Sequence, residues 1–163
     1  MAQRSSLAEQ QTLRTATDIG NRKGQAVCHT AEVSELRPER KDYFIHREGM
    51  VYAGSHVLAD LWGASGLDNA ELIEKALREA IAVCGATLLH IHLHCFGENG
   101  GVSGVAVLAE SHISVHTWPE RGFAAFDIFM CGACRPEKAI PVLRRYFRPA
   151  GMQIGQHKRG VVG

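Results

Sequence analysis

The 163-residue sequence lacks several features that mark specialised classes of protein. It contains no uninterrupted apolar run of the roughly 18 residues that a transmembrane helix needs. Its net charge is only +1, so it has no excess of basic residues for binding nucleic acid or an anionic membrane surface. Its first 25 residues lack the apolar stretch of a signal peptide. We therefore expect a cytoplasmic protein without nucleic-acid or membrane partners.

The cysteine content also lacks the marks of a disulfide scaffold. The five cysteines are Cys28, Cys84, Cys95, Cys131 and Cys134. An odd number of cysteines in a chain without a signal peptide argues against a framework of disulfides. Any cysteine with a special role is therefore expected to act through its thiol.

What the sequence does contain is a globular composition, with 45% hydrophobic and 21% charged residues. Its length suits one domain with a hydrophobic core. Residues 1–50 are polar and include a charged run at residues 37–42. We expect residues 1–50 to be a partly disordered N-terminal extension and residues 51–163 to form the folded domain.

Helical periodicity is clearest over residues 68–84. Apolar residues recur there at three- and four-residue intervals, behind a capping pattern formed by Asp68 and Glu71. Gly85 follows, where a helix commonly ends in a left-handed residue. A second helix, beginning at a proline, is expected over residues 136–146.

Alternating apolar and polar residues predict strands in the rest of the domain. The expected strands are residues 54–62, 87–96, 102–109, 111–118, 123–131 and 152–157. Short links between them favour antiparallel pairing. We predict the α+β class, as a two-layer sandwich with a mainly antiparallel sheet and helices packed on one face.

Reactive side chains are concentrated in the segment LAESHISVHTWPERGFAAFDIFMCG, residues 108–132. Ser111 with His112 or His116 and Asp127 has the composition of a hydrolase triad, but no G-x-S-x-G elbow surrounds the serine. In the alternative, the hydroxyl of Ser111 would attack the carbonyl carbon of the preceding residue, Glu110, and the chain would cleave itself at that bond. A histidine and a second hydroxyl, such as Ser103, would assist. The residue types alone leave these two alternatives open.

Two further patterns suggest a metal or redox site. His90, His92 and His94 share one face of an expected strand, and imidazole is a good zinc ligand. No compact set of cysteine or carboxylate ligands accompanies them, so we predict no metal. Cys131 and Cys134 form a C-x-x-C pair, but it follows a strand instead of opening a helix, which favours a structural role.

Four segments of the sequence resemble the S-adenosylmethionine decarboxylase proenzyme family in its short bacterial and archaeal form. These segments are GVSG (101–104), AESHISVHTWPE (109–120), GFAAFDIF (122–129) and MCG (130–132). The similarity extends from residues 54–60 to residues 157–160, and residues 1–50 have no counterpart in it. Among the shared patterns, E-S-H-x-x-x-H-T-W-P-E is the most specific.

The resemblance implies self-cleavage between Glu110 and Ser111, into a β chain of residues 1–110 and an α chain of residues 111–163. Ser111 would become a pyruvoyl group, the covalent cofactor, which forms a Schiff base with the substrate amine. His116 would be the processing base, and Ser103 would also assist processing.

Three further residues receive roles from the resemblance. Cys131 would donate the proton that replaces the lost carboxylate. Phe96 would stack on adenine, and Glu120 would hold the ribose. The physical chemistry of these groups suits such roles, since thiols transfer protons and carboxylates accept bonds from sugar hydroxyls.

The implied activity is decarboxylation of S-adenosylmethionine, whose product serves spermidine biosynthesis. An alternative is the same pyruvoyl chemistry on arginine or ornithine, and a more remote one is an uncleaved homologue that only binds a partner. The resemblance also implies a homodimer with its active site near the subunit interface. In a straight strand Ser111 and His116 face opposite sides, so we predict a break in regular pairing near residues 110–112.

Overall fold

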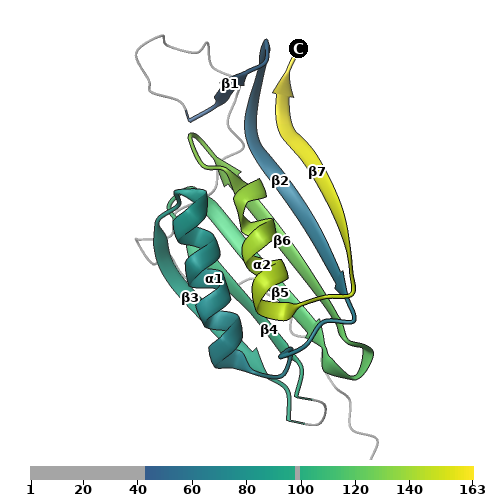
Figure 1. The fold of residues 1–163 in the computed structure, drawn as a ribbon. Coiled ribbons are helices and arrows are strands. Elements are labelled where there is room, and N and C mark those ends of the chain that lie inside the picture. Colours follow the sequence, from purple (N-terminus) through teal and green to yellow (C-terminus); the bar gives the residue numbers. More distant parts are fainter. Residues whose placement is uncertain (1–42, 98–99) are drawn as a thin grey trace, which may run out of the picture. The chain divides into compact units, whose positions relative to one another are not determined.

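The computed structural model describes residues 43–97 and 100–163 (Figure 1). Most of the predicted N-terminal extension, residues 1–42, lies outside the described residues. The strands are β1 (Ile45–Arg47), β2 (Met50–Trp62), β3 (Leu88–Cys95), β4 (Val102–Leu108), β5 (Ser111–Trp118), β6 (Phe123–Cys131) and β7 (Gly151–Val162). The helices are α1 (Ala70–Cys84) and α2 (Ala139–Phe147), with short 3₁₀ turns η1 (Pro119–Arg121) and η2 (Pro136–Lys138).

All the strands belong to one antiparallel sheet. Its order is β1-β2-β6-β5-β4-β3, and β7 also pairs with β2. Helices α1 and α2 lie side by side over one face of this sheet (Figure 1). The predicted α+β sandwich is therefore confirmed. No helix among the described residues is long and apolar enough to cross a membrane.

The ends of α1 follow from its capping residues. Asn69, and not Asp68 as the sequence pattern indicated, is the N-cap, and its side chain accepts a hydrogen bond from the Leu72 N–H at 2.9 Å. Gly85 ends the helix in the left-handed conformation, with φ 76°.

Helix α2 begins three residues later than predicted, because Pro136 opens the separate 3₁₀ turn η2. Pro141 lies in the first turn of α2. It is tolerated there because N–H groups in the first turn have no acceptor within the helix.

Two predicted strands are longer in the structure, and one strand was not predicted. β2 begins at Met50 and not at residue 54. β7 was expected over residues 152–157, but it pairs with β2 as far as Val162. Its last residues are mostly exposed, so hydrogen bonding to the edge of β2, and not burial, keeps them extended. β1 was not predicted as a strand, and it pairs with the first residues of β2.

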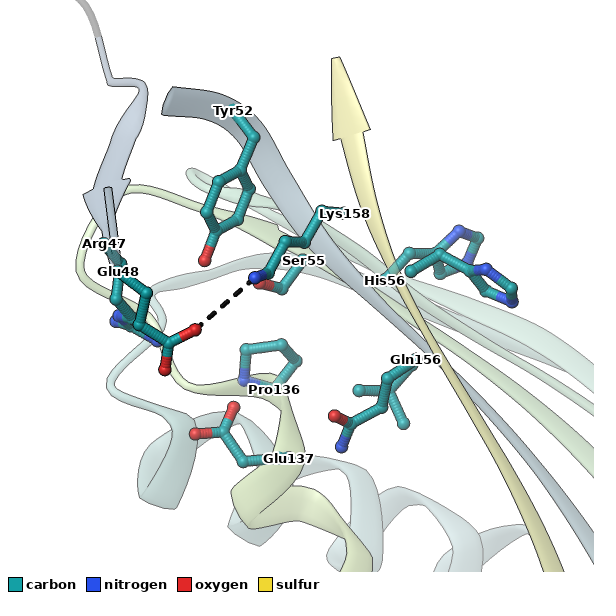
Figure 2. A pocket seen from close by; sticks show the side chains of 11 residues that line it. Arg47, Glu48, Tyr52, Ser55, His56, Pro136, Glu137, Gln156 and Lys158 are labelled. Atoms are coloured by element: carbon teal, nitrogen blue, oxygen red, sulfur yellow. Dashed lines mark ion pairs between the residues drawn. The ribbon is translucent and has the colours of Figure 1, made fainter. Parts of the chain in front are cut away.

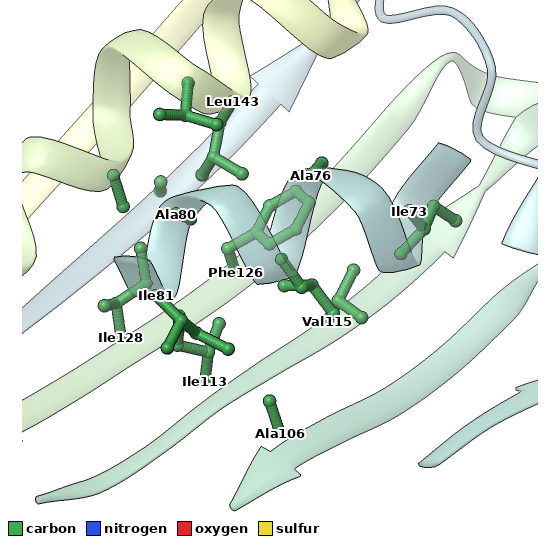
Figure 3. Close-up of a cluster of buried hydrophobic side chains, with 14 of the residues drawn as sticks. Ile73, Ala76, Ala80, Ile81, Ala106, Ile113, Val115, Phe126, Ile128 and Leu143 are labelled. Atoms are coloured by element: carbon green, nitrogen blue, oxygen red, sulfur yellow. The ribbon is translucent and has the colours of Figure 1, made fainter. Parts of the chain in front are cut away.

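The hydrophobic core lies between the helices and the sheet (Figure 3). Ile73 and Ala76 of α1 and Leu143 of α2 pack over Val115 and Phe126 of the central strands. These side chains are almost completely removed from water. Alternation then directs the intervening residues of each strand away from the helices.

We call the side of the sheet opposite α1 and α2 the helix-free face. On β5 it is formed by His112, Ser114 and His116, which alternate with the buried Ile113 and Val115. The face carries most of the polar residues that the sequence singled out.

Candidate active site

The junction between Glu110 and Ser111 is strained. A two-residue turn joins β4 to β5, and Leu108 pairs with Ser111 across it. Ser111 has φ 146°, a value that residues other than glycine seldom adopt. Such a conformation costs on the order of 1–3 kcal/mol, so the peptide bond before Ser111 lies where the backbone stores energy.

Glu110 is held by both its main chain and its side chain. Its carbonyl oxygen accepts a hydrogen bond from the Cys131 backbone N–H at 3.1 Å. Its carboxylate accepts one from the Thr87 N–H at 2.8 Å and one from the Thr87 hydroxyl at 3.2 Å. The carbonyl next to the strained residue is therefore already polarised by an N–H donor, and the glutamate side chain is clamped.

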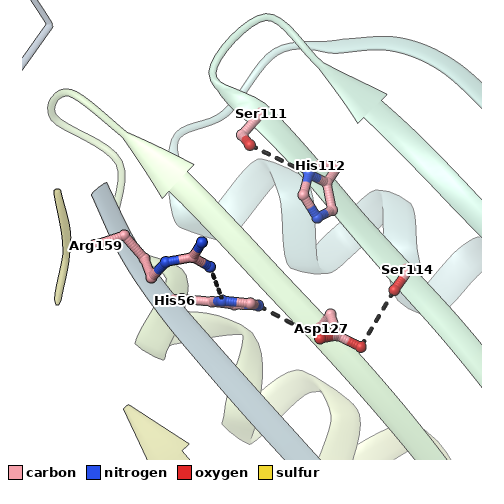
Figure 4. Close-up of polar contacts among 6 residues, drawn as sticks. All are labelled: His56, Ser111, His112, Ser114, Asp127 and Arg159. Carbon is pink, nitrogen blue, oxygen red and sulfur yellow. Dashed lines mark hydrogen bonds and ion pairs between the residues drawn. The ribbon is translucent and has the colours of Figure 1, made fainter. Parts of the chain in front are cut away.

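The Ser111 hydroxyl lies against the next residue in the chain. Its Oγ is 3.2 Å from Nδ1 of His112, and both are half-buried (Figure 4). The His112 ring lies beside that of Phe129, its partner on β6, with centroids 6.0 Å apart. Ser111 is therefore in contact with a potential base within its own chain.

A second group of predicted residues lies toward the other end of β5. Ser103 pairs with His116 across β4 and β5, and Ser103 Oγ is 2.9 Å from His116 Nδ1. The neighbouring Gly104 leaves no room for a side chain, since a Cβ there would approach the His92 carbonyl oxygen to 2.5 Å. This close approach of β3 and β4 accounts for the second glycine of the GVSG segment.

A hollow of about 480 Å³ opens beside this second group. It is lined by Phe96, Gly97, Ser103, His116, Thr117, Trp118 and Glu120. Phe96 is half-exposed, and its ring meets that of His94 edge-on, with centroids 4.8 Å apart. Glu120 is exposed on η1.

Trp118 belongs to this hollow, although the sequence gave it no site role. The residue is 42% exposed, and the centroid of its ring is 6.4 Å from that of His116 and 5.3 Å from that of Phe123. The available signal was its spacing, because a residue two positions from His116 on a strand shares its face.

The two groups do not meet within one chain. β5 pairs residue for residue with β4 from Ser111 to His116. At roughly 3.3 Å per residue, these two positions are separated by about 16 Å. The predicted break in regular pairing near residues 110–112 is wrong, because Ser111 and His112 pair in register with both β4 and β6. The backbone is irregular only in the φ value of Ser111, which does not bring His116 to Ser111.

The hydrolase triad is not assembled among the described residues. Asp127 contacts His56 at 3.4 Å and accepts a hydrogen bond from Ser114 at 3.4 Å, as Figure 4 shows. Burial lowers the pKa of His56, although the nearby Asp127 opposes the shift, and Arg159 approaches its Nδ1 at 3.2 Å. The acid that the triad needs is therefore engaged by a different histidine.

The cysteines differ in environment. Burial raises the pKa of Cys84 to about 11 and also raises the pKa of Cys134. Cys134 donates a hydrogen bond to the Gly85 carbonyl at 3.4 Å, which fits a structural role for this member of the C-x-x-C pair. Cys131 is only partly buried, beside the Glu110 carbonyl.

His90, His92 and His94 are exposed on β3. Within residues 43–97 and 100–163, no group of three or more histidine, cysteine or acidic residues could hold a metal ion.

A separate hollow of about 590 Å³ lies beside η2, β1 and β7 (Figure 2). Tyr52 and an ion pair between Lys158 and Glu48, 3.5 Å apart, contribute to its wall. None of the residues predicted to act in catalysis or cleavage lines it.

Comparison with known proteins identifies the class to which this fold and site belong. The family model of S-adenosylmethionine decarboxylase matches residues 55–160. The chain belongs to this family, as the sequence motifs predicted. β1 and the residues before it lie outside the match.

Individual relatives agree with the family match. The S-adenosylmethionine decarboxylase proenzyme of Thermomicrobium roseum is 47% identical over 67% of this chain and 95% of its own length. That of Methanococcus aeolicus is 51% identical over 68% of this chain and 97% of its own length. The crystal structure of the Aquifex aeolicus adenosylmethionine decarboxylase superposes with a TM-score of 0.63 at 34% identity, covering 69% of this chain and 94% of that one.

Proposed function

We propose that this chain is a self-processing, pyruvoyl-dependent decarboxylase that converts S-adenosylmethionine to its decarboxylated form and CO₂, for spermidine biosynthesis. The observation that carries the proposal is the Glu110–Ser111 junction. Its serine is backbone-strained and its carbonyl accepts the Cys131 N–H. Relatives named S-adenosylmethionine decarboxylase proenzyme, at 42–51% identity, support both the activity and the precursor form.

Cleavage at this junction would yield a β chain of residues 1–110 and an α chain that begins with the pyruvoyl group derived from Ser111. The described geometry fits the formation of that group. The Ser111 hydroxyl, the His112 imidazole and the polarised Glu110 carbonyl lie together at one bond, and the backbone of Ser111 is strained. When present, the group supplies an electron-accepting carbonyl for decarboxylation. The Cys131 backbone lies beside this position, and its partly buried thiol is the group proposed to return a proton to the substrate.

The hollow beside Ser103 and His116 is the proposed place for the nucleoside part of the substrate. Phe96 and Trp118 offer exposed ring faces for adenine and for the sulfonium cation. Glu120 offers a carboxylate for the ribose hydroxyls. Arginine or ornithine would leave these aromatic faces without a matching ring, and the names of the relatives do not favour them.

We further propose that the enzyme works as a homodimer whose active site takes residues from both copies. The separation of Ser111 and Cys131 from Ser103 and His116 supports this arrangement, because decarboxylation would need both groups around one substrate. The two groups are carried by the hairpins at opposite ends of the central strands. A two-fold axis would bring the first group of one copy to the second group of the other. A cytoplasmic location stays a prediction.

Intact-mass measurement of the purified protein tests the proposal. We expect two chains, of residues 1–110 and 111–163, the second blocked by a pyruvoyl group. Ser111→Ala should remain one chain and release no CO₂ from carboxyl-labelled S-adenosylmethionine. A wild-type chain that stays intact would overturn the proposal, and release from arginine or ornithine alone would correct the substrate.

A further inference from the structure

Self-cleavage begins with the Ser111 hydroxyl, which needs a base to become a good nucleophile. The family resemblance assigns a processing base, His116, but that residue is about five strand positions away and is engaged with Ser103. Among the described residues, His112 is the base that contacts Ser111 Oγ. We propose that His112 is the general base for the first step of cleavage, a role that rests on the proposed function above.

The environment of His112 suits this role. Its ring is half-buried on the helix-free face and lies beside Phe129, which restricts the orientations that the ring can take. To accept the Ser111 proton, Nδ1 must be unprotonated, so the neutral ring carries its hydrogen on Nε2. The 3.2 Å separation from Ser111 Oγ is short enough for direct proton transfer.

The first step is balanced without any added reagent. Ser111 Oγ bonds to the carbonyl carbon of Glu110 while its proton passes to His112 Nδ1. The carbonyl electron pair moves to the oxygen, which already faces the Cys131 N–H at 3.1 Å. The C–N bond then breaks as His112 returns the proton to the Ser111 nitrogen. The product is an ester between the Glu110 carbonyl carbon and Ser111 Oγ. The ester replaces the strained peptide bond, and the Ser111 nitrogen becomes a free amine.

This role divides the processing reaction between two histidines. His112 would form the ester within one chain, whereas His116 would act only afterwards, when the ester is eliminated from Ser111. The division explains how the first step can proceed although His116 lies far from Ser111 in its own chain.

The test measures ester formation separately from chain cleavage. Hydroxylamine cleaves the ester, releasing residues 1–110 and a second chain that begins with an intact serine and not with a pyruvoyl group. In the full-length protein, His116→Ala should accumulate this hydroxylamine-sensitive ester. Adding His112→Asn to that variant should slow the appearance of ester by about 100-fold, the usual contribution of a general base.

His112→Asn distinguishes catalysis from positioning. An asparagine amide oxygen can still accept a hydrogen bond from Ser111, but it cannot take up its proton. If His112 only positioned Ser111, Asn would preserve the rate. His112→Gln provides a second variant if the Asn protein fails to fold, as judged by circular dichroism against Ser111→Ala. His92→Asn, the same change elsewhere on the helix-free face, is the matched control and should form ester at the parent rate.

The outcomes are distinct. A wild-type chain that never cleaves contradicts the proposed function itself. A cleaving wild type whose folded His112 variants form ester at the parent rate overturns only the role of His112. The proposal is also overturned if His116→Ala alone forms no ester, because the first step would then need His116.

Discussion

At the scale of single residues, Glu110 shows how the site is prepared before any chemistry occurs. Three hydrogen bonds hold it, one on the carbonyl that Ser111 attacks in the proposed cleavage and two on the carboxylate. The donors come from the end of β6 and from Thr87, just before β3. The carboxylate clamp restrains rotation of the residue whose carbonyl must face Ser111 Oγ, and so favours the attacking geometry.

We expect Thr87→Val to slow self-cleavage by roughly three- to ten-fold, since it removes the hydroxyl contact to Glu110 and leaves the backbone contact. Thr87→Ser restores a hydroxyl and should recover the rate. A time course of precursor disappearance on gels measures both variants. Equal rates in all three proteins would show that the clamp does not assist cleavage.

Cysteine reactivity should follow burial. With the pKa of Cys84 raised to about 11, about one thiol in a thousand is ionised at pH 8, so iodoacetamide should modify Cys84 very slowly. Cys134, also buried with a raised pKa, should be protected as well. Among the four cysteines that the structure describes, the exposed Cys95 should react first, as peptide mass mapping would show. Rapid labelling of Cys84 in the folded protein would contradict its burial.

At the scale of elements, the hairpin of β4 and β5 is the unit that carries both groups of the site. Its tight turn bears Glu110, and its open end bears Ser103 and His116. Helix α1 packs on the sheet face opposite the helix-free face and contributes no side chain to either group. Changes in α1 are therefore expected to affect stability before activity.

Asn69→Ala should lower the free energy of unfolding by about 1 kcal/mol, because the first turn of α1 loses its side-chain cap. Urea unfolding of the Ser111→Ala precursor, which remains a single chain, measures this without interference from cleavage. Asp68→Ala is the matched control at the neighbouring position and should change stability much less. Equal losses in the two variants would refute the assignment of the cap.

At the scale of the whole molecule, the proposed homodimer would make assembly a condition of activity, because the two groups are separated along β5. One chain places Ser111 and Cys131 at one end of β5 and β6, and His116 and the aromatic hollow toward the other. A second copy is the simplest source of the missing groups at each end. Dissociation of the proposed dimer would leave each copy with the Ser111 group and the His116 group, neither of which is a complete site.

Co-expression of Ser111→Ala with His116→Ala tests this shared site. Each variant alone should remain uncleaved, the first for lack of a hydroxyl and the second because its ester persists. In a mixed dimer, His116 of the Ser111→Ala chain can serve Ser111 of the other chain, so the His116→Ala chain should be cleaved. Distinct affinity tags identify the cleaved chain by mass. No cleavage in purified mixed dimers would contradict a site shared between copies.

Much of the fold was predictable from the sequence, because its signals are local. Alternation placed the bounds of β5 and β6 correctly, and helical periodicity with Gly85 located α1. The motif around Ser111 was sufficient to indicate the family. β7 was predicted too short because its later residues are kept extended by pairing with β2, about 100 residues earlier in the chain, and a local pattern does not report such pairing.

The amino-acid sequence by itself determined the central strands, the two helices and the set of reactive residues, since these depend on side-chain period and residue type. Only the tertiary structure decided which of those residues meet. It placed His112 and not His116 against Ser111, connected Glu110 to Thr87 and Cys131, and separated the two groups along β5. The physical reason is that these relations arise from strand register and from one strained backbone angle, both of which are properties of the assembled sheet.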